Sequence, residues 1–434
     1  MKYRLTLLLV LSLTSRAAFC QAAARVPAGT PFSVQIDKKL PMRAGQLIRA
    51  ELIYPVYVHN KLVLPEKTVL DGTVTDLRPN RSLRSSARLR GDFTPFRIPV
   101  VRFTDIVLAG GKTIPIATGT ATDGAPIYRL VAPPPRKGGL LHQQFDKGVQ
   151  MLRDQISFFT APGKRDRFTE LLYSQLPWHP QSVQKGTAWT VETAAPFDVP
   201  PQPASASAPA DKGTKPADPS TWIVRAYLDK KLSSTSSNPG DPVRAIVAEP
   251  IYNSDHTIAV PQGSTLVGAV TQAKPARRFG RAGVLRFNFR QIVLPSGRTQ
   301  NVQAALTAAD SSAVQNLAMT SEGQVKPKPQ DKIVVPLLLA ALAASPLHQD
   351  RDDGSLELFR KRALASNSVG LAGFIAGTAS GSANVAAGFG AYGAALSIYN
   401  RWIKRGRDVT FAKDTRIVVQ TTPRRAAVLK PASR

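Results

Sequence analysis

The sequence contains five histidines, and none of them has a spacing that builds a metal or catalytic site. They are His59, His142, His179, His256 and His348. Zinc sites of the H-E-x-x-H type need two histidines one helical turn apart, and no two of these histidines are that close. His59 and His256 follow similar strands beside a turn, which indicates turn residues rather than metal ligands or catalytic bases.

Other chemistry-bearing motifs are incomplete or missing. The stretch from Asp350 to Gly354 resembles the start of a calcium loop, but its glycine comes one position early. Lys361 also occupies the twelfth position, where a bidentate glutamate is required. The sequence has no glycine-rich phosphate loop and no nucleophile elbow. We therefore predict that the protein is not an enzyme and has no catalytic residues, no cofactor and no metal site.

The strongest compositional signal is positive charge, with a formal net charge of +28 and a pI near 10.6. Two arginine-rich stretches, expected to be loops, carry part of this charge. The candidate anion-binding residues are Arg84 and Arg88 in the first stretch, and Arg277, Arg278 and Arg281 in the second. Such clusters favour an anionic envelope polymer or nucleic acid as a partner. The alternative is an ordinary solvated basic surface.

Residues 363–400 contain no charged side chain and are rich in glycine and alanine. Gly370, Gly373, Gly377 and Gly381 recur at three- or four-residue steps, a spacing that allows helices to approach closely in a membrane. Trp402 and several basic residues follow, as expected at a membrane interface. We predict that this insert contacts the membrane and supports homo-oligomers. The alternative is a buried helical hairpin in a soluble domain.

The elements that would position these residues form an internal repeat. The stretch Ile251–Val270 matches Val56–Val74, with Pro261 aligned to Pro65 and Gly268 aligned to Gly72. Both stretches read as short strands separated by turns. Later in each copy, alternating residues such as Leu285, Phe287 and Phe289 predict a strand with one buried face.

Each copy is interrupted before a similar closing strand, at 185–191 and 413–419. The first interruption has apolar residues at helical spacing between Leu141 and Phe159, which predicts an amphipathic helix. The second contains the charge-free stretch. We therefore predict a mainly β fold of two small β-barrel modules, each interrupted by a helical insertion before its closing strand.

These patterns divide the chain into five parts. Residues 1–24 form a signal peptide, with Lys2 and Arg4 before an apolar run and small residues after it. The first module spans 25–195, a linker rich in Pro, Ala and Ser spans 196–220, and the second module spans 221–422. A basic tail occupies 423–434. Cys20 is the sole cysteine, so cleavage beyond it leaves no thiol. We predict export to the periplasm or outer membrane of a bacterium.

The second module resembles the carboxy-terminal barrel of TrbI-like conjugation proteins, found in outer-membrane complexes of type IV secretion systems. The motifs that carry the resemblance are AEPIYNSDHTIAVPQGSTLVGAV, VLRFNFRQIVLPSG and DVTFAKDTRIVV. The first module matches less of this pattern. The resemblance implies a barrel with a membrane-crossing helical insert, assembled as a ring, and it implies no catalytic residues.

The resulting hypothesis is an exported structural or channel-forming envelope protein. We expect this chain to differ from the TrbI-like pattern in two ways: it would carry two barrels, and its amino terminus is predicted to be a cleavable signal where those proteins keep an inner-membrane helix. A soluble periplasmic binding module for an anionic envelope polymer is the second hypothesis, and an envelope hydrolase is the third.

Overall fold

A computed structural model describes most of the β framework. The described residues are 23–89, 92–122, 124–133, 178–200, 222–253, 257–312, 315–328, 399 and 403–423. Strands dominate this part of the chain, so the mainly β prediction is confirmed. The helical insertions predicted at 141–159 and 363–400 lie outside the described residues, apart from Tyr399.

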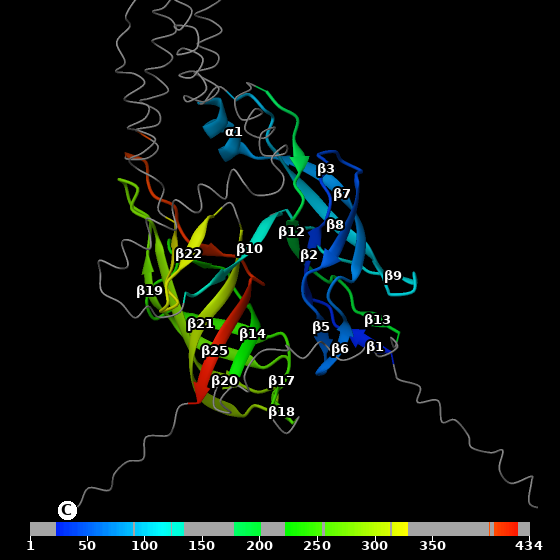
Figure 1. The fold of residues 1–434 in the computed structure, drawn as a ribbon, viewed down its shortest axis with the longest axis vertical. Coiled ribbons are helices and arrows are strands. Elements are labelled where there is room, and N and C mark those ends of the chain that lie inside the picture. The colour runs from blue at the N-terminus through cyan, green and yellow to red at the C-terminus, as the bar shows by residue number, and fades with distance from the viewer. Residues whose placement is uncertain are drawn as a thin grey trace, which may run out of the picture.

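The second module contains a closed β-barrel of six antiparallel strands (Figure 1). Neighbouring strands follow the order β20–β19–β16–β14–β25–β21, and β21 pairs back onto β20 to close the ring. The strands are β14 (Trp222–Leu228), β16 (Pro242–Val247), β19 (Thr265–Lys274), β20 (Val284–Val293), β21 (Thr299–Ser312) and β25 (Arg416–Pro423).

The first module repeats this cyclic order. Starting from β12, the strand equivalent to β25, its neighbouring strands are β12–β2–β4–β7–β8–β9. The strands are β2 (Pro31–Ile36), β4 (Leu47–Leu52), β7 (Val69–Pro79), β8 (Arg97–Val107), β9 (Thr113–Pro115) and β12 (Thr187–Glu192). Its ring closes through single bridges: Ala121 pairs with Val101, and Thr118 pairs with Thr193. The two modules therefore share one strand order with different closures.

One strand joins the modules. The first two residues of β10 (Ala125–Val131) pair with β12 of the first module, and the remaining five pair with β21 of the second. Fifteen strands consequently form one continuous sheet. The repeat pattern in the sequence does not reveal this crossing, because pairing between distant strands leaves no local pattern.

Short elements occupy equivalent places beside both rings. β5 (Val56–Val58) pairs with β6 (Lys61–Leu64) in the first module, and β17 (Ile251–Tyr252) pairs with β18 (Ile258–Val260) in the second. A second matched set is β3 (Leu40–Pro41) with β11 (Ser182–Val183), and β15 (Leu232–Ser233) with β24 (Thr410–Phe411). The remaining elements are β1 (Ala24–Val26), β13 (Phe197–Val199), β22 (Leu317–Met319), β23 (Val325–Pro327) and α1 (Arg81–Arg88).

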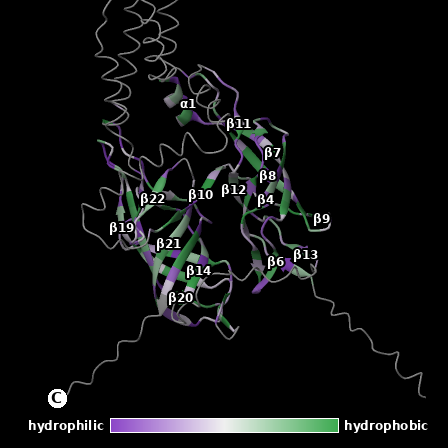
Figure 2. Cartoon of the chain, viewed as in Figure 1, coloured by the Kyte–Doolittle hydropathy of each residue, from purple (hydrophilic) through white to green (hydrophobic). Residues whose placement is uncertain are grey.

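Each ring encloses its own apolar core. Leu285, Phe287 and Phe289 on β20 are all buried, as their alternation predicts. Figure 2 shows hydrophobic and hydrophilic residues alternating along β14, β20 and β21. Burial of one face of each strand is the main stabilising contribution, at about 25 cal/mol for each Å² of apolar surface removed from water.

Matching glycines mark a bulge at the same place in both rings. The β7–β8 register shifts at Gly72, and the β19–β20 register shifts at Gly268. A Cβ atom on Gly72 would lie 2.4 Å from the carbonyl oxygen of Arg102, and one on Gly268 would lie 1.9 Å from that of Asn288. Only glycine allows so close an approach of the next strand, which explains why both copies carry it.

Two local features differ from the sequence-based expectations. Phe197–Val199 lies within the stretch expected to be linker, yet it forms β13 and pairs with β1. The first arginine-rich stretch is helical where a loop was expected, so Arg84 and Arg88 lie on α1. The side chain of Asn80 caps this helix by accepting a hydrogen bond from Leu83 N–H.

Candidate functional site

Five of the predicted site residues lie outside the described part of the chain. They are Gly370, Gly373, Gly377, Gly381 and Trp402. Among the described residues, no helix has the length and apolar character needed to cross a bilayer. The described candidates are therefore the five arginines, and the segments that hold them define two surfaces.

The first of these, the module-two basic surface, is formed by the β19–β20 connection and residues 403–408. It presents seven exposed cationic side chains: Lys274, Arg277, Arg278, Arg281, Lys404, Arg405 and Arg407. Two apolar side chains lie among them, Phe279 with 67% of its surface exposed and Ile403 with 47%. The structure thus brings Arg277, Arg278 and Arg281 together with Lys274 of the same connection. It adds Lys404, Arg405 and Arg407, basic residues that the sequence pattern linked only to a membrane interface.

Backbone hydrogen bonds hold the two segments of this surface together. Gly280 N–H donates to the carbonyl oxygen of Lys404 at 3.0 Å, and Gly406 N–H donates to that of Arg277 at 2.9 Å. A Cβ atom on Gly406 would lie 2.1 Å from the carbonyl oxygen of Arg281, so the chains touch through glycine. The cations are consequently presented by a fixed backbone.

Asp408 also holds the module-two basic surface to the barrel. Its Oδ1 accepts hydrogen bonds from Ala276 N–H at 2.7 Å and from the hydroxyl of Ser234 at 3.0 Å. Burial alone would raise the pKa of this carboxyl, but the hydrogen bonds outweigh burial and hold its pKa below the ordinary value. Asp408 therefore stays ionised and anchors residues 403–408 to the barrel.

The module-one basic surface is built around α1. Its cationic side chains are Arg78, Arg81, Arg84 and Arg88, and its exposed apolar side chains are Leu83, Leu89, Phe93 and Trp178. The Nε of Arg84 donates to the carbonyl oxygen of Phe96 at 3.0 Å, so this side chain also attaches the helix to the following strand. Arg88 is exposed in the last turn of α1.

The chain re-enters the first module beside this surface. His179 N–H donates to Thr94 Oγ1 at 3.1 Å, and the His179 ring packs edge-on against Phe96. Its Nε2 also lies 3.6 Å from an Asp92 carboxylate oxygen. In both modules, then, the β connection rich in arginine contacts the segment that precedes the closing strand.

Both basic surfaces lie opposite the hairpins. In Figure 1, α1 lies at the upper end of the first module, and the β5–β6 and β17–β18 hairpins lie at the lower end. β19 begins shortly after β18 and ends at Lys274, so the module-two basic surface is also at the end away from its hairpin. The hairpin ends touch each other, because Gln262 N–H donates to Asn60 Oδ1 at 2.7 Å.

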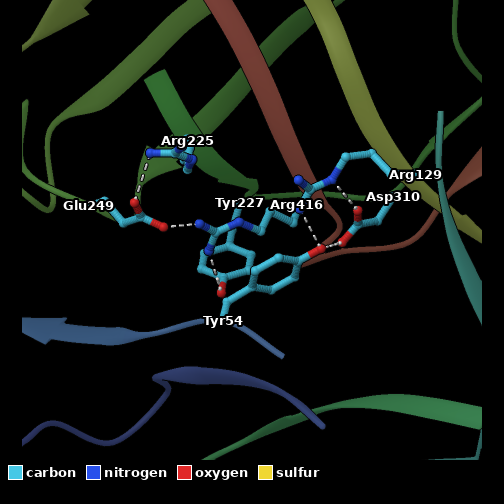
Figure 3. A network of polar contacts seen from close by, with 7 residues as sticks. All are labelled: Tyr54, Arg129, Arg225, Tyr227, Glu249, Asp310 and Arg416. Atoms are coloured by element: carbon cyan, nitrogen blue, oxygen red, sulfur yellow. Dashed lines mark hydrogen bonds and ion pairs between the residues drawn. The ribbon is translucent and has the colours of Figure 1, made fainter. Parts of the chain in front are cut away.

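A network of polar side chains, buried at Tyr54, Asp310 and Arg416, joins the modules (Figure 3). Its members are Tyr54, Arg129, Arg225, Tyr227, Glu249, Asp310 and Arg416. Tyr54 comes from the first module and Arg129 from the bridging strand β10, whereas the other five belong to the second module.

Arg416 is at the centre of this network. Its guanidinium donates to the Glu249 carboxylate and, at 3.2 Å, to the hydroxyl of Tyr227. The Tyr54 ring covers it with 4.0 Å between the guanidinium carbon and the ring centroid. Burial opposes the charge of Arg416, but Tyr227 and Glu249 outweigh this effect and raise its pKa. The side chain therefore remains a buried cation between the modules.

The two repeats meet at this point through equivalent positions. Tyr54 follows β4 by two residues, and Glu249 follows β16 by two residues. Both contact Arg416, whereas the first module carries Ala188 at the position aligned with Arg416. The sequence patterns above do not predict this network. One available signal is a lone arginine in an apolar strand where the other copy has alanine.

A carboxyl pair forms another contact between the modules. Lys413 Nζ lies 2.5 Å from Glu192 Oε1, and Glu192 also shares a hydrogen bond with Asp414. Burial, and then this hydrogen bond, raise the pKa of Asp414 to about 7. Asp414 has a left-handed backbone with φ of 60°, and the aligned residue in the first module is Gly186 with φ of 82°.

The described residues contain no group of three or more His, Cys, Asp or Glu side chains that could hold a metal ion. His59 has a φ of 50° in the turn between β5 and β6, which agrees with the turn predicted there. The arrangement of the described side chains suits electrostatic binding and mechanical linkage between modules.

No protein-family model matches this sequence, and no curated protein matches it. Among solved structures, the chain is similar to ComB10 of the Com type IV secretion system of Helicobacter pylori, at 11% identity and a TM-score of 0.20. The match covers 48% of this chain and 86% of that chain. A TM-score this low supports no conclusion about fold or function.

Proposed function

We propose that this chain is an exported structural protein of the bacterial cell envelope, without catalytic activity, whose two linked barrels carry a membrane-contacting insert in the second module. In the fuller form of the proposal, copies assemble into a channel like the TrbI-like proteins that the sequence motifs resemble. The predicted export signal, the charge-free stretch 363–400 and those motifs support this role.

The observation that carries the proposal is where the second insertion attaches. Before it, β23 pairs with β20 at Leu285; after it, the carbonyl oxygen of Arg407 accepts a hydrogen bond from Gly283 N–H. Both attachments are at the same end of β20, and six described strands close the barrel. This arrangement supports a barrel that serves as the base for the predicted insertion.

Membrane fractionation of two variants tests this role. Ala376→Asp places a charge in the charge-free stretch, which costs about 2.5–3.5 kcal/mol at the centre of a spanning helix. We expect the variant to be released by alkaline extraction, whereas wild type stays with the membrane. Ala44→Asp adds the same charge at an exposed turn and controls for charge alone.

Gly377→Leu tests assembly separately, because it adds bulk without charge at a predicted helix contact. We expect smaller oligomers on size-exclusion chromatography in detergent, with membrane association retained. Wild-type behaviour of both Ala376→Asp and Gly377→Leu would remove the support for a membrane and assembly role.

A soluble periplasmic module that binds an anionic envelope polymer is the second candidate, and the seven cations of the module-two basic surface favour it. Fractionation separates the two candidates: release of the wild-type chain by alkali, with retention on an anionic polysaccharide column, would favour the soluble module.

A further inference from the structure

The module-two basic surface combines two kinds of exposed side chain that soluble surfaces normally keep apart. Seven cations lie near Phe279 and Ile403, and both apolar side chains are exposed. Basic residues next to exposed aromatic and aliphatic residues are typical of proteins that lie against anionic lipid, where apolar groups enter the headgroup region. The cationic side chains supply attraction to lipid phosphate.

The charge of this surface is not neutralised from within. Residues 274–283 contain no acidic side chain, and residues 403–408 contain only Asp408. That carboxylate is tied to Ser234 and Ala276 through Oδ1 and pairs with Arg405 through Oδ2. The other six cations therefore face outward as a cluster, and the backbone bonds between the segments keep them together.

We propose that the module-two basic surface binds the phosphate groups of an anionic lipid surface, with Phe279 and Ile403 entering the headgroup layer. This inference rests on the proposed envelope role and names the lipid groups that would hold the second barrel against the membrane. Lipid fits this surface better than nucleic acid, because stacking on successive bases needs several aromatic faces, and the described residues of this surface offer one, Phe279.

Vesicle flotation with the full-length chain tests the electrostatic part. The probes are vesicles of phosphatidylcholine alone and of phosphatidylcholine mixed with phosphatidylglycerol, at low and high salt. The measured quantity is the ratio of partition coefficients between the two vesicle types. In the variant, Arg277, Arg278 and Arg281 are each replaced by glutamine. The ratio is expected to fall about a hundredfold at low salt, since each cation near an anionic surface contributes about a factor of five.

The matched control removes the same charge from the opposite end. Arg25, Lys61 and Lys67 are exposed at or near the hairpin end, and each is replaced by glutamine. This control is expected to keep the wild-type ratio. An equal fall in both triple variants would overturn the proposal, because it would show an effect of net charge alone.

Phe279→Asn tests the apolar part with little cost to folding. Phe279 has a left-handed backbone with φ of 61°, a conformation that asparagine tolerates better than phenylalanine. The variant is expected to bind mixed vesicles several-fold more weakly, and the remaining binding should be more sensitive to salt.

Wild-type binding to mixed vesicles by the triple arginine variant would overturn the lipid assignment. If the same variant also lost binding to a DNA duplex, nucleic acid would be favoured as the partner. Failure of the broader envelope proposal gives a different result: alkaline extraction would release the wild-type chain, while the vesicle ratio would still depend on Arg277, Arg278 and Arg281.

Discussion

The hydroxyl of Tyr54 donates a 2.5 Å hydrogen bond to Oδ2 of Asp310, and the two residues belong to different modules. Both are buried, and Arg129 donates to the same hydroxyl at 3.0 Å. Burial raises the pKa of Asp310 above its ordinary value, and Tyr54, Arg129 and Arg416 offset only part of this effect. The contact therefore couples the stability of the two modules.

Tyr54→Phe removes this hydrogen bond but keeps the ring that covers Arg416. Hydrogen bonds to charged groups contribute about 1.5–3 kcal/mol, so we expect a loss of that size in the free energy of unfolding measured in urea. Tyr252→Phe is the matched control, because its hydroxyl reaches the carbonyl oxygen of Asn60 at 3.4 Å from an exposed position. A control loss as large as that of Tyr54→Phe would contradict a special role for Tyr54.

Arg416→Ala should be more damaging, because it leaves the Glu249 carboxylate without its buried partner. Breaking a buried ion pair from one side costs about 3–5 kcal/mol. Arg225→Ala removes the other partner of Glu249. The Arg225 side chain is 50% exposed, whereas that of Arg416 is 2% exposed. We expect that control to cost less than about 1 kcal/mol. Denaturant midpoints of the two variants check the difference, and equal midpoints would contradict it.

Asp414→Asn should change how stability depends on pH. Because the pKa of Asp414 is raised from 3.8 to about 7, its contribution is complete below about 3.8 and is lost as the pH rises through about 7. The partly exposed carboxyl should account for about 1–2 kcal/mol after solvent screening. Asparagine also tolerates the left-handed backbone at this position.

Thermal unfolding between about pH 5 and about pH 8 measures this effect. Wild type should lose stability over that range, and Asp414→Asn should be the more stable of the two at the upper end. Glu192 opposes the trend only at lower pH, since hydrogen bonding to Lys413 lowers its pKa below 4.5. Asp198→Asn, at an exposed site on β13, is the control. Parallel pH profiles for wild type and Asp414→Asn would contradict the assignment.

Gly268→Ala should disrupt the second barrel. The added Cβ would lie 1.9 Å from the Asn288 carbonyl oxygen and 2.6 Å from the Phe289 Cα atom, both of them backbone atoms. Forced overpacking costs about 1–3 kcal/mol or more, and we expect the upper part of this range. Gly119→Ala is the control, because its Cβ would lie 3.7 Å from the nearest atom. Circular dichroism melts test the pair, and similar melting temperatures would contradict the close approach.

The sequence by itself determined the repeated strand frame. Alternation along Leu285, Phe287 and Phe289 predicts which face of β20 is buried, because side chains of a strand point to opposite faces in turn. The alignment of Gly72 with Gly268 also marks equivalent positions in the two copies, although the bulge at both became visible only in the strand registers. These features are local, so periodicity and turn residues are enough to reveal them.

Only the tertiary structure decided how the modules meet. Tyr54, Glu249 and Arg416 are far apart in the chain, and they converge because both rings close and β10 crosses between them. The same holds for the three cations at 404–407, which join Arg277, Arg278 and Arg281 through backbone bonds between distant segments. Contacts of this kind depend on strand register and ring closure, which no local pattern specifies.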